Sequence, residues 1–232
     1  MARILVWDLP TRVFHWLLTV GLLACFGFTL LAGEHSSLFS AHMILGIVLG
    51  LMVVLRVIWG FVGTRYACFG SFLFSPSTVV KYVKDAFAGS GQRYVGHNPG
   101  SSYAIFAMLA LVGLVVTTGL LVSSGNEAAE ELHEIASYAL LAVIMVHVVG
   151  VIWYTVRHRE NITLSMITGI KEGSPTEAIR SSRPLAAWVF VAAVGFLAVG
   201  LFRNHDRLKG QTKLPILGTV IQLDEEEGGQ EE

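Results

Sequence analysis

Five separate stretches of this sequence are each long and apolar enough to cross a lipid bilayer. A membrane-spanning helix needs about 20 mainly apolar residues, because the hydrocarbon layer is about 30 Å thick and each helical residue advances about 1.5 Å. Only 14% of the 232 residues are charged, against about 25% in water-soluble domains. We therefore expect an all-α membrane protein. The expected spans cover residues 13–32, 41–62, 103–122, 132–156 and 185–202.

The connections between these spans are polar and differ in character. "SPSTVVKYVKDAFAG", between the second and third spans, is typical of a short amphipathic helix at the membrane surface over residues 76–88. Residues 161–184 are expected to form a connection between the fourth and fifth spans. Residues 203–232 form a tail ending in "DEEEGGQEE", which is too acidic and glycine-rich to pack. The charges gather in these connections and form no basic face, so nucleic acid is not expected as a partner.

Lys and Arg residues are distributed unevenly between the two sides of the expected bundle. All but four of the 16 fall on the side that holds the N-terminus, and the other four lie in the tail. The two short connections on the opposite side, "GEHSSLFS" and "SSGNEAAEE", contain neither residue type. Because cytoplasmic loops are enriched in Lys and Arg, the N-terminus is expected in the cytoplasm and the acidic tail on the outer side.

Four histidines fall at two matching depths of this arrangement. His133 and His147 are fourteen residues apart in the fourth span, so on a helix they share one face and differ in depth by about 21 Å. His15 lies near the cytoplasmic start of the first span, and His42 lies near the outer start of the second. The topology therefore pairs His15 with His147 on the inner side and His42 with His133 on the outer side.

Such pairs favour haem binding. Imidazole is a common axial ligand of haem iron, and helix bundles build such sites from inward-facing side chains. With both axial positions filled by protein, the iron can only exchange electrons. The two cysteines, Cys25 and Cys68, are not expected to form a disulfide, and no C-x-x-C-H motif occurs, so any haem is expected to be of b type. Gly46 and Gly50 leave space for a porphyrin plane or for a close helix contact.

Other interpretations of the histidines remain open. A histidine near a helix end can be an interfacial anchor, and a transporter without haem could use the four as a proton relay. A relay needs charged partners, yet apart from Arg56 the five apolar cores contain almost no acid or base. A third interpretation is a membrane anchor subunit that tethers a soluble enzyme. The sequence has no Ser-His-Asp arrangement, metal-hydrolase motif or phosphate loop, so any enzymatic activity would rest on quinone turnover.

Several motifs resemble the bacterial cytochrome b561 family of di-haem membrane cytochromes, whose relatives include b-type subunits of nickel-iron hydrogenases and formate dehydrogenases. They are "VWDLPTRVFHW", "HMILG", "RVIWGFVGTRYACF", "YVGHNPG" and "SMITGIKEG", and the resemblance covers roughly residues 4–200. It implies a four-helix bundle over residues 1–160 that holds two b haems. The implied axial ligands are His15, His42, His133 and His147.

The resemblance also implies a location and partners. Family members lie in the bacterial inner membrane and commonly pass electrons between quinone and a periplasmic redox protein, such as a c-type cytochrome or a hydrogenase. The N-terminus would then be cytoplasmic and the tail periplasmic. The fifth span occurs in only part of the family, and the tail from Arg203 onward matches nothing in it.

Four further residues near the cytoplasmic side have expected roles in binding a ligand or in anchoring a helix. Arg56, near the cytoplasmic end of the second span, is expected either to pair with a haem propionate or to anchor the helix by extending to the interface. His97 and Asn98 are candidates to hydrogen-bond a quinone carbonyl, and the same "GHNP" segment is also typical of a turn into the third span. Trp7, just before the first span, is expected to be an interfacial anchor.

Overall fold

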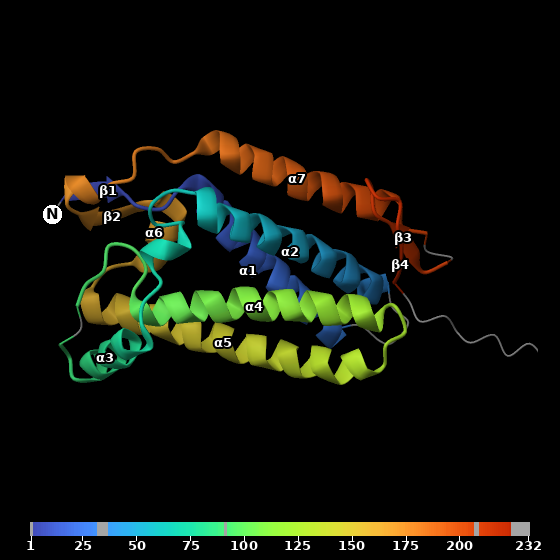
Figure 1. The fold of residues 1–232 in the computed structure, drawn as a ribbon, viewed down its shortest axis with the longest axis horizontal. Helices are drawn as coiled ribbons and strands as arrows, with labels where there is room; N and C mark the ends of the chain where they lie inside the picture. Colours follow the sequence, from blue (N-terminus) through green and yellow to red (C-terminus); the bar gives the residue numbers. More distant parts are fainter. Residues whose placement is uncertain (1, 32–36, 91, 207–208, 224–232) are drawn as a thin grey trace, which may run out of the picture.

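Five long helices make up most of the computed structural model (Figure 1), which describes residues 2–31, 37–90, 92–206 and 209–223. Each is long and apolar enough to cross a membrane, which confirms the predicted all-α membrane class. The five helices are α1 (Leu9–Leu31), α2 (Ser37–Val62), α4 (Pro99–Val122), α5 (Ala128–His158) and α7 (Pro184–Arg203).

The first four of these helices begin one turn before the apolar stretches predicted from the sequence. Polar side chains outside the apolar run set these starts at α1 and α4. Asp8 Oδ1 accepts a hydrogen bond from the amide of Thr11 at 2.9 Å, and Asn98 Oδ1 accepts one from the amide of Ser101 at 2.8 Å. A capping oxygen satisfies an amide that lacks a partner in the first turn. Hydropathy alone therefore places the start of these helices too late.

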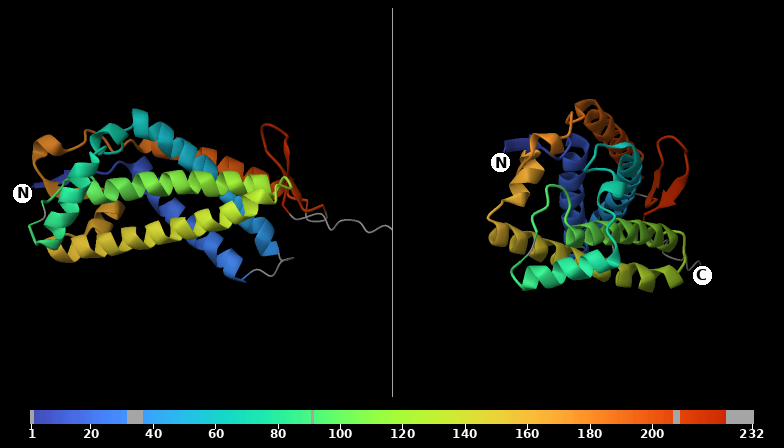
Figure 2. Two further views of the ribbon diagram at one scale, coloured as in Figure 1. Left: turned by 60° about the horizontal axis from the view of Figure 1, so that its bottom comes forward. Right: turned by 60° about the vertical axis from the view of Figure 1, so that its left-hand side comes forward.

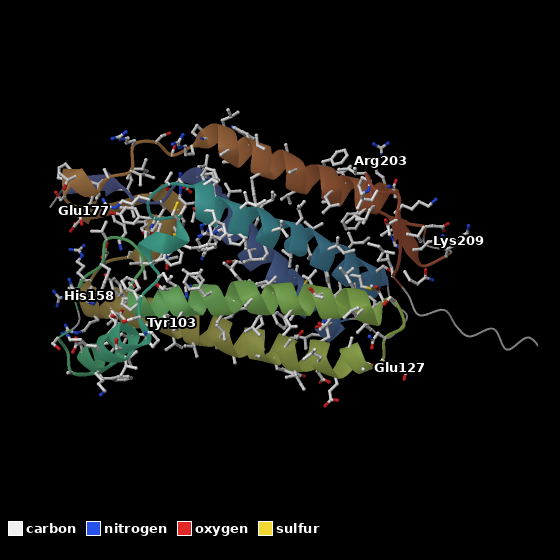
Figure 3. The ribbon with its side chains drawn as sticks, in the orientation of Figure 1. Tyr103, Glu127, His158, Glu177, Arg203 and Lys209 are labelled. Atoms are coloured by element: carbon white, nitrogen blue, oxygen red, sulfur yellow. The ribbon has the colours of Figure 1, made fainter. Side chains whose placement is uncertain are left out.

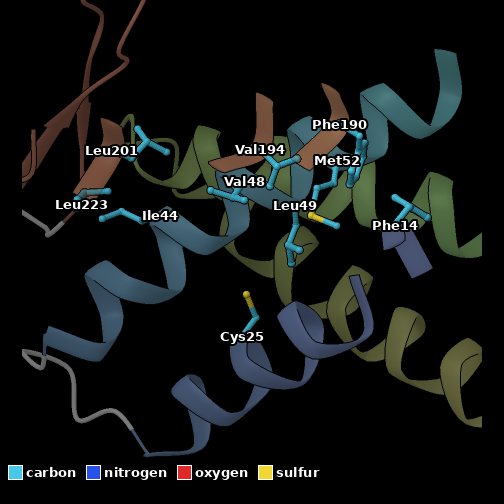
Figure 4. Close-up of a cluster of buried hydrophobic side chains, with 10 residues drawn as sticks. All are labelled: Phe14, Cys25, Ile44, Val48, Leu49, Met52, Phe190, Val194, Leu201 and Leu223. Carbon is cyan, nitrogen blue, oxygen red and sulfur yellow. The ribbon is translucent and has the colours of Figure 1, made fainter. Parts of the chain in front are cut away.

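The five helices pack as two pairs with an added fifth member (Figures 1 and 2). α1 packs on α2, α4 packs on α5, and α2 also contacts α4, while α7 covers α1 and α2. Figure 4 shows the apolar cluster between α1, α2 and α7, which includes Phe14, Leu49, Met52, Phe190 and Val194. Apolar contacts with α1 and α2 thus hold α7 against the other four helices.

Short elements gather at the end of the bundle that holds the N-terminus (Figure 1). They are β1 (Ala2–Leu5), α3 (Pro76–Phe87), α6 (Ile162–Thr168), β2 (Ile170–Gly173) and two 3-10 turns, Phe69–Ser71 and Pro175–Glu177. β1 and β2 form an antiparallel pair in which Ala2 lies opposite Gly173 and Leu5 lies opposite Ile170. This pairing joins the N-terminus to the segment that follows α5 and α6.

A β-hairpin that the sequence analysis did not anticipate follows α7 at the opposite end. β3 (Gln211–Lys213) pairs antiparallel with β4 (Val220–Gln222). Part of the expected acidic tail is therefore folded. The sequence "DEEEGGQEE" at residues 224–232 lies outside the described residues, so the expectation that it does not pack stays a prediction.

Candidate functional site

His42 of α2 and His133 of α5 face each other near the end of the bundle that carries the hairpin. Their ring centroids are 6.4 Å apart and the ring planes are inclined by 77°. His42 Nδ1 lies 3.1 Å from the carbonyl oxygen of Cys25, and His133 Nδ1 lies 3.0 Å from that of Val115. A carbonyl oxygen only accepts hydrogen bonds, so Nδ1 is the protonated nitrogen in both rings. The lone pair of each Nε2 is left for another partner.

The spacing of these two rings suits one metal ion between them. Two imidazoles that bind an ion from opposite sides hold their centroids about 6.2 Å apart, since the metal–nitrogen bond is about 2.0 Å and the nitrogen lies about 1.1 Å from its ring centroid. The observed 6.4 Å matches this value. Metal-binding histidines usually donate their second ring nitrogen to a carbonyl or carboxylate, which fixes the tautomer and the ring orientation. Both members of the pair have this arrangement.

Small residues on neighbouring helices shape the surroundings of this pair. A Cβ at Gly119 would lie 3.2 Å from Cε1 of His133, so the absence of a side chain there lets the ring lie against α4. A Cβ at Gly46, one turn after His42, would meet no atom of the described chain within 4 Å. A Cβ at Gly50 would lie 2.8 Å from Cγ1 of Val116. Gly46 therefore leaves open space, whereas Gly50 permits a close contact between α2 and α4.

The second predicted pair, His15 and His147, lies toward the end of the bundle that holds the N-terminus. The two side chains are close enough to interact electrostatically, and both also interact with His97. The His15 ring lies edge-on to Trp16, with centroids 5.1 Å apart. Its Nδ1 is buried and has no hydrogen-bond partner among the described residues. The inner pair thus differs from the outer pair, in which both Nδ1 atoms contact carbonyl oxygens.

Arg56 is buried near His97, toward the same end of the bundle as the inner pair. Its side chain is 4% exposed, Nη2 donates to the carbonyl oxygen of Ala67 at 3.2 Å, and the guanidinium lies 5.1 Å from the ring centroid of Phe69. Nη1 is also buried and has no partner among the described residues. Such burial contradicts the interpretation of Arg56 as an anchor that extends to the interface. A buried N–H without an acceptor is costly, and it fits an anionic group such as a haem propionate.

His97 lies between two aromatic rings just before α4. Its ring centroid is 4.7 Å from that of Trp7 and 4.5 Å from that of Phe72. Burial, together with the positive charges of Arg56 and Lys171, lowers the pKa of His97 to about 3, so the ring is neutral at physiological pH. Its Nε2 is buried without a partner among the described residues. This nitrogen is therefore available to a ligand.

Asn98, the other residue predicted to contact quinone, is part of the start of α4. Its side-chain oxygen caps the helix, and its carbonyl oxygen accepts hydrogen bonds from the hydroxyl groups of Ser101 and Ser102 at 3.0 and 2.9 Å. These contacts favour the alternative in which "GHNP" forms a turn into the third span. Of the two residues, His97 is the better candidate for binding.

A family model matches most of the chain. The model of prokaryotic cytochrome b561 matches residues 6–169, a segment that contains all four paired histidines, Arg56 and His97. The chain belongs to the prokaryotic cytochrome b561 family. This cytochrome is therefore a membrane electron-transfer protein, and its b-type family implies haem b as the cofactor.

Three curated relatives carry the name "Probable Ni/Fe-hydrogenase B-type cytochrome subunit". The proteins from Bradyrhizobium diazoefficiens, Rhizobium leguminosarum bv. viciae and Rhodobacter capsulatus are 24%, 26% and 22% identical to this cytochrome. The alignments cover 72%, 71% and 72% of the chain and 85%, 87% and 81% of the relatives. No solved structure shows significant similarity. The resemblance to hydrogenase-related b-type cytochromes is thus confirmed, and α7 and the hairpin lie beyond the family match.

The structure explains why the cytochrome carries "WDLPTRVFHW" and "SMITGI" together. Trp7 Nε1 donates to Oγ of Ser165 at 3.1 Å, Trp16 Nε1 donates to the carbonyl oxygen of Met166 at 3.1 Å, and Arg12 donates to that of Ile167 at 2.5 Å. These three hydrogen bonds hold α6 against the start of α1, next to His15. Trp7 is 6% exposed, so the expectation that it is an interfacial anchor is wrong.

Asp8 is a further member of this end of the site that the sequence analysis missed. Its carboxylate is buried and accepts hydrogen bonds from Trp59 Nε1 at 3.1 Å and from the hydroxyl of Thr64 at 2.6 Å, besides the amide of Thr11. It thereby joins the start of α1 to the end of α2. An acidic residue followed by Leu-Pro before an apolar run is a recognisable helix-start signal. That signal would have identified its capping role but not its two other contacts.

Lys171 of β2 is a second buried charged residue at the end of the bundle that holds the N-terminus. Its Nζ donates to the carbonyl oxygen of Tyr94 at 3.0 Å and lies 3.7 Å from Oε1 of Glu160. Glu160 also pairs with Arg93 at 3.0 Å. Burial lowers the pKa of Lys171, while Glu160 opposes the shift. These contacts fix the segment after α5 against the segment before α4, close to His97.

Proposed function

We propose that this cytochrome carries electrons across the membrane through two bis-histidine b haems. His42 and His133 would hold the outer haem, and His15 and His147 the inner one. The observation that supports this most strongly is the outer pair: two imidazoles from different helices at the spacing that one iron requires, each with Nδ1 on a carbonyl oxygen. The four histidines then serve as ligands rather than as a proton relay.

Each haem, when bound, supplies one-electron exchange at its iron. The chain's own groups do the rest. The carbonyl oxygens of Cys25 and Val115 accept from Nδ1 of His42 and His133 and so keep Nε2 of both rings deprotonated. Apolar side chains pack between α1, α2, α4 and α5 and would exclude water. Held by two histidines, each haem would exchange electrons and would not bind oxygen or a substrate at its iron.

The inner site has different surroundings. We assign Arg56 to a propionate of the inner haem, because its Nη1 is a buried donor that lacks an acceptor among the described residues. The fixed positive charge would favour the reduced state of the nearby haem by simple electrostatics. His97, neutral and with an unpaired Nε2, is the candidate to bind a quinone carbonyl near this haem.

Electrons would pass between membrane quinone at the inner site and a periplasmic redox protein at the outer site. This assignment takes the N-terminus as cytoplasmic and the tail as periplasmic in a bacterial inner membrane, as the distribution of Lys and Arg predicts. The names of the curated relatives support a redox enzyme of the hydrogenase type as partner, with a c-type cytochrome as the alternative. The alternative function is that of a membrane anchor that only tethers the partner. Such an anchor would need no electron path through the bundle.

The haem content of the purified protein tests the proposal. We expect a sharp α band in the dithionite-reduced minus oxidised spectrum and two haems per chain in the pyridine haemochrome assay. His42→Ala and His147→Ala should each lose one haem, whereas His158→Ala, on the same helix as His147, should keep both. A protein that remains colourless after expression with ample haem would refute it, as would full haem content in both ligand variants.

A path through the bundle is distinguished from simple tethering by a further measurement. The protein is placed in vesicles with its hairpin end facing the lumen. Ferricyanide is trapped inside, and quinol is added to the membrane. Reduction of the trapped ferricyanide that is lost in both His42→Ala and His147→Ala supports electron transfer across the bilayer. Unchanged reduction in either variant supports the anchor role.

A further inference from the structure

The hairpin that follows α7 folds back over the last turn of that helix. Thr212 Oγ1 donates to the carbonyl oxygen of Leu201 at 2.7 Å, and Asn204 Nδ2 donates to the carbonyl oxygen of Lys213 at 3.1 Å. Pro215 packs directly on Gly200, where any Cβ would overlap its ring. These contacts hold the hairpin loop at the depth of the last turn of a membrane-spanning helix.

The hairpin has one apolar side that is buried and a tip that is not. Thr212 and Leu223 are fully buried, and Leu214 and Ile221 pack against the cluster of α1, α2 and α7. The loop between the strands carries Ile216 and Leu217, which are 82% and 76% exposed. Two large aliphatic side chains on a tightly anchored loop are unfavourable in water. Their exposure indicates contact with something outside the chain.

The tip continues the lipid-facing surface of α7. Phe196, Val199 and Phe202 form an exposed apolar face along the outer half of this helix. Gly200 lies four residues after Phe196, so the two share one row on the helix surface. Because Pro215 sits on Gly200, the loop lies on the same row. The exposed side chains of the loop thus extend a surface that a membrane-spanning helix presents to lipid.

Three exposed cations lie around the base of the hairpin, which also carries the half-buried Asp206. Figure 3 shows Arg203 and Lys209 at this end of the molecule, and both are exposed, as is Lys213 of β3. The only Lys and Arg residues expected on this side of the membrane are those of the tail. An apolar tip flanked by cations is the arrangement that binds a membrane interface, where the cations contact lipid phosphates.

We propose that residues 214–219 insert into the interfacial layer of the phospholipid bilayer beside α7, with Arg203, Lys209 and Lys213 at the level of the lipid phosphates. The hairpin is then a second membrane contact that fixes the end of α7. This inference depends on α7 crossing the membrane and does not depend on the haem assignment.

Spin labelling of the full chain in vesicles of phosphatidylcholine and phosphatidylglycerol tests the insertion. The half-buried Cys68 is removed by Cys68→Ser, Cys25 is buried, and a nitroxide is attached at Leu217→Cys. Accessibility to oxygen, which concentrates in lipid, is compared with accessibility to a water-soluble nickel complex. We expect oxygen to dominate by several-fold at position 217. Glu127→Cys, in the connection between α4 and α5 at the same end, is the control and should show the reverse.

Two outcomes would overturn the proposal. One is a label at position 217 that is as accessible to the nickel complex as the label at 127. The other is a label that is water-exposed in vesicles and becomes protected only when a redox partner protein is added, which would make the tip a protein-binding surface. Ile216→Asp with Leu217→Asp gives a second measurement, since it should increase nickel accessibility at a label on Val220→Cys while the haem content of the protein stays unchanged.

Discussion

His42 of α2 and His133 of α5 are separated in the sequence by the whole of one other membrane-spanning helix, α4, yet their imidazole rings lie 6.4 Å apart. Each ring is held from a third helix: α1 supplies the carbonyl oxygen of Cys25 and α4 supplies that of Val115. Four helices therefore fix one pair of rings. Because a carbonyl in each case fixes the tautomer, the pair is organised for metal binding by the protein alone.

Gly119 provides the first prediction, because it lies directly against the His133 ring. Replacement by Val places branched carbons where a Cβ already comes within 3.2 Å of Cε1, so the ring must turn away from Val115. We expect Gly119→Val to lose the outer haem and to keep the inner one, measured by haem stoichiometry. Gly195→Ala, where a Cβ meets no atom of the described chain within 4 Å, should keep both. Two haems in Gly119→Val would contradict the assigned role.

Gly46 and Gly50 should respond in opposite ways to substitution. Gly46→Leu fills open space next to His42 and should reduce haem binding while the helices still pack. Gly50→Ala introduces a Cβ 2.8 Å from Val116 and should destabilise the α2–α4 contact by about 1–3 kcal/mol, the usual cost of overpacking. Haem content and the midpoint of unfolding in detergent distinguish the two effects. If both variants lost the same amount of haem and the same stability, the separate roles of Gly46 in haem binding and Gly50 in helix packing would be refuted.

Helical geometry explains why the depths of the four histidines could be predicted and why their partners could not. A spacing of fourteen residues converts directly into depth through the helical rise. The acceptors of the outer pair are backbone carbonyl oxygens, which every residue has, so no sequence pattern marks Cys25 or Val115. Trp7 was misinterpreted for a similar reason. An aromatic residue before a span has the same local pattern whether its indole faces lipid or, as here, a serine 158 residues later.

The polar ends of the molecule were predicted least well. Helices α1 and α4 begin at capping residues that hydropathy does not detect, and the hairpin strands have three residues each, too few for an alternating pattern to be recognised. The buried contacts of Asp8 and Lys171 join segments that are far apart in the sequence. Such contacts depend on how the helices assemble, and no local pattern determines them.

The buried charge of Arg56 predicts a change in redox potential. Removing a cation near the inner haem makes reduction less favourable, so Arg56→Gln should lower the midpoint potential of that haem by an amount on the order of tens of millivolts. The outer haem should be unaffected. A redox titration that resolves the two haems by their spectra measures both. Arg56→Lys, which keeps the charge, should retain most of the original potential, and an unchanged potential in Arg56→Gln would contradict the contact with the inner site.

His97 predicts a loss of stability in mild acid. Its folded-state pKa is about 3 and its ordinary value is 6.5, so between these values the unfolded chain binds a proton that the folded chain does not. Stability is then complete above about pH 6.5 and falls as the pH decreases toward 3. The ring's surroundings give the direction of this shift. Trp7 and Phe72 enclose the ring, and Arg56, Lys171, His147 and His15 disfavour a positive charge on it.

The matched variant is His97→Phe, which keeps an aromatic ring between Trp7 and Phe72 and removes the titrating group. Between pH 7 and pH 5 the wild-type protein should lose about 2 kcal/mol more stability than the variant, the value that the pKa difference gives for one group at pH 5. Denaturant unfolding of the detergent-solubilised protein at both pH values measures this difference. Since all other histidines are common to the two proteins, equal losses would show that His97 accepts a proton in the folded state and is not enclosed as described.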